Sequence, residues 1–125
     1  MLVLYFPHKL LLMKIYSNAA DNFVKDLKAA TVLVYGNDMG GVKTMEQRLI
    51  KRYLGQTYDP ASVVEIDGDE LKDNPGRLTD EVMSKSFFAD KKVIRLRDAP
   101  DSAVELVQNA IAQLDDSVLL LLTSG

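Results

Sequence analysis

A glycine-rich stretch between a predicted strand and a predicted helix is the first candidate for chemistry. A phosphate-binding loop has Gly, four other residues, Gly, Lys and then Ser or Thr, because backbone N–H groups and the lysine hold the phosphates together. Gly36 and Gly41 have this spacing. Val42, however, stands at the lysine position, and Lys43 and Thr44 each come one residue late. Since one residue turns a side chain by about 100° around a helix, the stretch predicts a degenerate nucleotide loop, a turn that binds no phosphate.

An acidic residue after a later predicted strand is the second part of a candidate nucleotide site. In nucleotide hydrolases, a carboxylate at such a strand end holds Mg²⁺. Asp98 has this position, but two arginines interrupt the strand and Ala99 stands where a catalytic acid is expected. An active P-loop ATPase or kinase that uses Lys43, Thr44 and Asp98 is therefore the alternative hypothesis. The preferred hypothesis is that the chain binds no cofactor and no metal.

Two adjacent aromatic residues, Phe87 and Phe88, form a candidate anchor for a partner protein. Neighbouring residues of a helix point about 100° apart, so the two rings cannot share one face. A ring that is exposed near a helix end would fit an apolar pocket on another protein. Taken by themselves, the residues favour the other interpretation, in which both rings pack the preceding helix onto the sheet.

A basic cluster lies around this pair. Within thirteen positions the chain has Lys85, Lys91, Lys92, Arg95 and Arg97. Such a cluster could meet phosphate groups or an acidic protein surface. A solvated strand end is the simpler interpretation, since Asp90 and Asp98 dilute the positive charge.

The elements that must position these residues alternate along the chain. Apolar and β-branched runs predict strands at 31–35, 62–66, 91–97 and 117–122. Apolar residues three or four apart predict the inward faces of helices: Ala20, Phe23, Val24 and Leu27; Val42, Met45, Leu49 and Tyr53; Leu78 and Val82; Val104, Val107, Ile111 and Leu114. Asn74 is predicted to cap the third helix, with Pro75 at its first position. The alternation predicts an α/β fold, a doubly wound, mainly parallel sheet with helices on both faces.

Composition narrows the function further. The chain has 125 residues, 15 Lys and Arg against 18 Asp and Glu, one His and no Cys, with a net charge of −3. The length is that of one domain. Without Cys there is no disulfide, no thiol nucleophile and no cysteine zinc site, and His8 alone cannot form a histidine metal site. The acidic balance disfavours a dedicated DNA-binding module.

The two ends of the chain are unusual. Residues 1–12 are strongly apolar but too short to span a membrane. Met13 is a second candidate for the first residue of the natural protein. Residues 1–12 are interpreted as an upstream extension that is disordered or, if it is ordered, forms an exposed edge strand over 1–6. The domain itself would be 13–125. Because the sequence stops directly after a strand of central type, it is expected to be a fragment, truncated at the C-terminus.

From Met13 onward, the chain resembles the N-terminal domain of the delta subunit of bacterial DNA polymerase III. The resemblance lies in Met13-Lys14-Ile15, AATVLVYGND at 29–38, VEIDGDEL at 64–71 and SFFADKKVIRLRDA at 86–99. It implies a P-loop, AAA+-like core with a degenerate nucleotide loop. It also implies a cytoplasmic replication protein that binds the ring-shaped beta sliding clamp and favours ring opening without hydrolysing ATP. As a subunit of the polymerase III holoenzyme, it would have the clamp-loader subunits gamma/tau and delta prime as partners and meet DNA indirectly.

The resemblance also implies which residues bind the clamp. In this family the contact is an apolar wedge of the Ser-Leu-Phe type after the third helix, which falls on Ser86, Phe87 and Phe88. Phe87 replaces the usual leucine. The three residues before Ser86 depart further, because a glutamine and an apolar residue are common there, and this predicts a low affinity. For Phe87 and Phe88, the resemblance reverses the preference and favours clamp binding over core packing.

Overall fold

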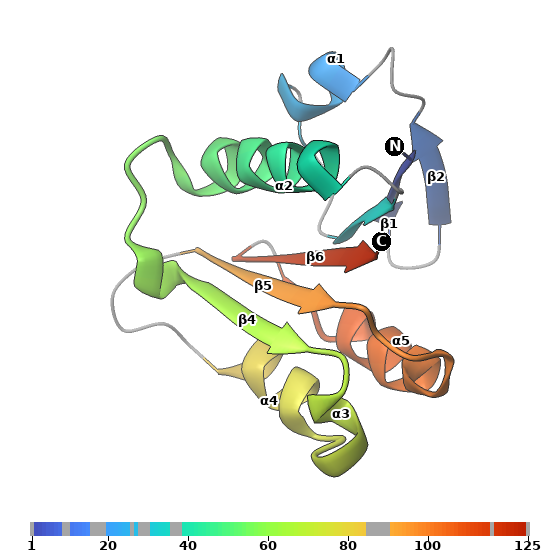
Figure 1. Ribbon diagram of the computed structural model, residues 1–125. Coiled ribbons are helices and arrows are strands. Elements are labelled where there is room, and N and C mark those ends of the chain that lie inside the picture. Colours follow the sequence, from blue (N-terminus) through green and yellow to red (C-terminus); the bar gives the residue numbers. More distant parts are fainter. Residues whose placement is uncertain are drawn as a thin grey trace.

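A six-stranded sheet organises the protein (Figure 1). The computed structural model describes residues 2–8, 11–15, 20–25, 27, 31–35, 39–84, 91–115 and 117–124. The strands have the order β2-β1-β3-β6-β5-β4 across the sheet. Their bounds are β1 Leu2–His8, β2 Leu11–Ile15, β3 Thr31–Tyr35, β4 Val63–Asp67, β5 Lys92–Arg97 and β6 Val118–Ser124.

Four neighbouring strands, β3, β6, β5 and β4, are parallel throughout. β6 lies between β3 and β5, with Leu121 opposite Val32 and Leu119 opposite Val93. Its residues 118–121 are all buried, as the unbroken apolar run predicted, because a central parallel strand is covered on both faces. The α/β architecture and the parallel sheet predicted from the sequence are confirmed.

Helices cover both faces of the parallel strands (Figure 1). Helices α1 (Ala20–Lys25) and α2 (Met39–Leu54) lie on one face. Helices α3 (Glu70–Asp73), α4 (Arg77–Met83) and α5 (Val104–Ala112) lie on the other, and the short 3₁₀ turns η2 (Pro60–Ser62) and η3 (Asp101–Ala103) precede β4 and α5. β5 divides its side chains between two cores, since Val93 packs toward α2 whereas Ile94 and Leu96 pack toward α4 and α5.

Two local predictions are corrected, and one short helix was not predicted. Val104 was expected to point inward but is 53% exposed, because the buried face of this segment runs through Ala103, Ala110 and Ile111 and leaves Val104 beside it. Helix α4 begins at Arg77 after Gly76, so the predicted cap and proline form a turn before the helix. The acidic stretch after β4 contains the short helix α3, which its lack of apolar periodicity concealed.

The N-terminal residues form a hairpin that extends the sheet. β1 pairs antiparallel with β2 on one side and with β3 on the other, where Val3 is opposite Val34. β1 is therefore an interior strand and β2 is the edge, which differs from the edge strand expected over 1–6. The division of the chain after residue 12 stays a prediction. Over the described ranges, no helix is long and apolar enough to cross a membrane.

Candidate functional site

The start of helix α2 lies where the sequence predicted a degenerate nucleotide loop. Helix α2 begins at Met39, so Gly40 and Gly41 belong to its first turn. Gly36 lies outside the described residues. A phosphate-binding loop keeps the residues between its two glycines outside the helix, so that their N–H groups can point at one anion. The glycine turn predicted over 36–41 is thus corrected, because its second half is helical.

The residues at and next to the lysine and serine/threonine positions of the motif are either buried in the core or exposed on α2. Val42 is 2% exposed and packs in the core between α2 and the sheet, as predicted. Lys43 and Thr44 are exposed. The Thr44 Oγ1 donates a hydrogen bond to the carbonyl oxygen of Gly40, 2.9 Å away, one turn earlier in the helix. Its hydroxyl is therefore engaged by its own helix rather than presented to a metal ion.

Asp98 belongs to a backbone junction at the carboxyl ends of three strands. Its N–H donates to the carbonyl oxygen of Thr123 at 2.9 Å, and its φ of 49° is in the left-handed region that Asp tolerates. Gly68 donates its N–H to the carbonyl oxygen of Arg97 at 2.7 Å. A Cβ on Gly68 would lie 2.7 Å from the Cα of Ala99, so only glycine fits. The junction accounts for the Asp98 backbone conformation without a ligand.

The predicted basic cluster does not form one surface. Lys92 is 5% exposed and points toward α4, whereas Arg95 and Arg97 lie on the α2 side of the sheet. The Nζ of Lys91 lies 5.0 Å from the ring centre of Tyr53 in α2. Lys85 is outside the part of the chain that the structure describes. Alternate residues of β5 face opposite sides, so neither a phosphate-binding patch nor a solvated strand end is confirmed.

Arg95 is the centre of an ion-pair network that sequence reasoning missed. Its Nη2 donates to Oε2 of Glu46, whose side chain is 7% exposed, and its Nη1 lies 3.9 Å from Oε2 of Glu65. Arg97 Nε lies 2.9 Å from Oε1 of Glu65. Arg95 Nε is buried and has no hydrogen-bond partner among the described residues. One signal was available in the sequence, since Glu46 falls on the apolar stripe of α2, four residues after Val42.

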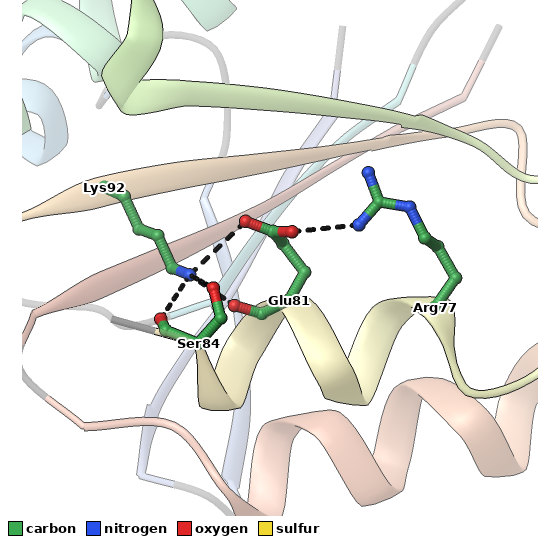
Figure 2. A network of polar contacts seen from close by, with 4 residues as sticks. All are labelled: Arg77, Glu81, Ser84 and Lys92. Atoms are coloured by element: carbon green, nitrogen blue, oxygen red, sulfur yellow. Dashed lines mark hydrogen bonds and ion pairs between the residues drawn. The ribbon is translucent and has the colours of Figure 1, made fainter. Parts of the chain in front are cut away.

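Lys92 is the centre of a second network, on the other face of β5 (Figure 2). Its Nζ donates to the carbonyl oxygen of Ser84 at 2.6 Å and contacts Ser84 Oγ at 3.2 Å. It also donates to the carbonyl oxygen of Glu81 and lies 3.4 Å from Glu81 Oε1. Arg77 Nη1 lies 2.9 Å from the other carboxylate oxygen of Glu81. The ammonium therefore joins the end of α4 to the first residue of β5.

Ser86, Phe87 and Phe88, the predicted clamp contact, lie outside the described residues. The structure describes the chain up to Ser84 and again from Lys91. Met83, at the end of α4, is 61% exposed. The residues that flank the predicted contact on either side are therefore placed, and the Lys92 network connects them.

Comparison with known proteins gives one family. Residues 32–125, about three quarters of the chain, match the family described as "DNA polymerase III, delta subunit". The matched range contains the predicted degenerate loop and the segment of Ser86, Phe87 and Phe88. No significant match was found among curated proteins or among solved structures.

Proposed function

Because the chain belongs to the DNA polymerase III delta subunit family, we propose that it binds the beta sliding clamp and favours opening of the ring without hydrolysing ATP. The family has a role in DNA replication, in the clamp-loader complex of the polymerase. The observation that carries the proposal is the match over residues 32–125, which includes both segments singled out by their chemistry.

The proposed clamp contact is the segment of Ser86, Phe87 and Phe88. Burial of one aromatic side chain in an apolar pocket contributes about 1.5–3 kcal/mol, so two rings supply enough for a measurable affinity. Met83 supports this location, because it adds exposed apolar surface at the end of the helix that leads into the segment. Ring opening then needs no chemistry, since a partner that binds the open ring more tightly shifts the population toward it.

The absence of ATP hydrolysis is proposed from the start of α2. The four parallel strands and the helix that follows β3 are compatible with a P-loop, AAA+-like core. Val42 is buried at the position where a lysine would hold phosphates, and the Thr44 hydroxyl is hydrogen-bonded to Gly40. These contacts count against the alternative ATPase or kinase that uses Lys43, Thr44 and Asp98.

The remaining partners follow from the same family. We propose that the gamma/tau and delta prime subunits assemble with this chain, that DNA is met indirectly, and that the protein acts in the cytoplasm. The ion pairs of Arg95, Arg97 and Lys92 support the indirect role for DNA, because these cations already face carboxylates of the same chain.

Calorimetric titration of the chain with the sliding clamp of the same organism tests the proposal, with Mg²⁺-ATP as a parallel titrant. Heat from the clamp and none from ATP is the expected result. Saturable, magnesium-dependent ATP binding without clamp binding would restore the enzyme hypothesis instead.

Substitution of both aromatic residues tests the contact itself. F87A/F88A is expected to lower clamp affinity at least about a hundredfold, since two buried rings are lost. The circular dichroism spectrum and the melting temperature serve as controls for folding. A folded double variant with wild-type affinity would disprove the assignment of these residues.

A further inference from the structure

We propose that Lys92 is a positioning residue for clamp binding: its buried ammonium fastens the end of α4 to the start of β5 and so fixes both ends of the segment 85–90. The inference rests on the proposed function, because that segment contains Phe87 and Phe88. It assigns the role to a residue that makes its contacts within the chain rather than with the clamp.

Lys92 lies in β5 and makes hydrogen bonds to the end of α4, so its side chain connects the two elements. Its side chain is 7% exposed, and its Nζ reaches the backbone carbonyl oxygens of both Glu81 and Ser84 (Figure 2). The carbonyl group of Glu81 belongs to the last turn of α4 and that of Ser84 to its C-cap, and carbonyl groups at this end of a helix lack intrahelical N–H donors. A cation at this end also interacts favourably with the helix dipole. The ammonium thus satisfies groups that would otherwise need water.

The side chain of Glu81 is itself held in place. Arg77, one turn earlier in α4, lies 2.9 Å from one carboxylate oxygen, while Lys92 lies 3.4 Å from the other (Figure 2). The carboxylate therefore sits between two cations and balances the buried charge of Lys92. A buried ammonium is stable only with such partners, and its hydrogen bonds fix the relative positions of α4 and β5 more narrowly than an apolar contact would.

The start of β5 is anchored from two further directions. The backbone N–H of Lys92 donates to the carbonyl oxygen of Ser117 at 2.9 Å, before β6. The neighbouring Lys91 places its Nζ 5.0 Å from the ring centre of Tyr53, on the opposite face of the sheet. The point where the chain returns to the sheet is thus held to β6 and α2. Lys92 adds the connection to the point where the chain leaves α4.

A segment held at both ends loses less conformational entropy when it binds a partner. Replacing Lys92 with Met keeps the length and apolar stem of the side chain but removes the donor that connects the two ends. K92M is therefore expected to weaken clamp binding by about tenfold through lost preorganisation. In a short peptide the connection does not exist, so the same substitution is expected to have no effect there.

The experiment measures clamp affinity by calorimetry for the full chain and for a synthetic peptide of residues 83–93, each with Lys92 or with Met. E46A is the matched control in the full chain, because it breaks the buried ion pair on the other face of β5. All affinities are measured at a temperature where every variant is folded. The inference is supported if K92M weakens the full chain about tenfold, while the two peptides bind equally and E46A binds as the wild type does.

Three results would overturn the inference. Wild-type affinity of folded K92M would mean that the connection does not position the segment. An equal loss in the peptide would mean that Lys92 contacts the clamp itself. A loss in E46A as large as that in K92M would also count against it, since the effect would then follow general destabilisation.

Further variants separate this inference from the proposed function. If F87A/F88A abolishes binding while K92M does not alter it, only the inference fails. If F87A/F88A binds like the wild type, the assignment of the contact fails, and the inference fails with it.

Should K92M not fold, the variant E81Q tests the inference instead, because it removes the negative charge beside Lys92 and keeps both backbone acceptors. A loss of about threefold supports positioning, and wild-type affinity of E81Q overturns it.

Discussion

The two faces of strand β5 carry two cations with different partners, the buried Lys92 and the partly buried Arg95. On the α4 side, Lys92 donates to two backbone carbonyl groups and contacts one carboxylate. On the α2 side, Arg95 faces the carboxylates of Glu46 and Glu65. An ammonium is a compact charge with three donors that suits converging carbonyl oxygens, whereas the flat guanidinium fork suits carboxylates. The two residues are therefore not interchangeable, although both are basic and lie on one strand.

The two networks also differ in the distance along the chain that they bridge. Arg95 is 49 residues from Glu46, so this pair connects α2 to a strand that follows only after β4, α3 and α4. Lys92 is 8 residues from Ser84 and 11 from Glu81. The first network thus bears on the stability of the whole fold. The second bears mainly on the geometry of one short segment.

The largest effect on stability is expected from breaking the Arg95 network. E46A leaves a partly buried guanidinium without its nearest carboxylate, which is expected to lower the free energy of unfolding by up to about 3–5 kcal/mol. Urea unfolding followed by circular dichroism measures this change. A loss below about 1 kcal/mol would show that Arg95 is hydrated or re-paired with Glu65, and that the contrast between the two faces is weaker than the geometry indicates.

A smaller effect is expected when both partners are replaced. E46L/R95M removes the buried charges together and fills the space with apolar side chains, so it is expected to be within about 1–2 kcal/mol of the wild type. Comparison with the single variants E46L and R95M completes a double-mutant cycle. Additive losses in this cycle would mean that the two side chains are not coupled.

The smallest effect is expected at the exposed end of the same network. Arg97 and Glu65 lie 2.9 Å apart, but their side chains are 40% and 49% exposed. R97A is therefore expected to lower the free energy of unfolding by at most about 1 kcal/mol. The difference from the wild type should also shrink as salt is added, because exposed charges are screened. A large, salt-independent loss would place Arg97 among the residues that stabilise the core.

Sequence patterns predicted the elements well where burial is regular. The strand predicted over 91–97, the apolar stripe from Val42 to Tyr53 and the apolar strand over 117–122 are all confirmed. The predictions failed where small residues form the buried face of a helix. Ala103 and Ala110 are buried, whereas Val104 is exposed. They also failed where a helix has no apolar period, as in α3.

The candidate site was predictable only in part. The shifted lysine and threonine predicted a loop without phosphate chemistry, and this stays a prediction; in the structure Lys43 is exposed and Thr44 is hydrogen-bonded within α2. The role of Ser86, Phe87 and Phe88 stays a prediction. The environment of the basic cluster was predicted wrongly. A sequence pattern indicates which face of a strand a side chain is on, but it does not show which acceptor groups the neighbouring helix places there.

The sequence by itself determined the class of fold and the family, since periodicity and local motifs are properties of the chain order. Only the tertiary structure decided that Lys92 meets the end of α4 and that Arg95 meets Glu46. It also decided that β1 joins the sheet beside β3. Each of these contacts joins separate elements, and their packing alone brings a donor within hydrogen-bonding distance of its acceptor.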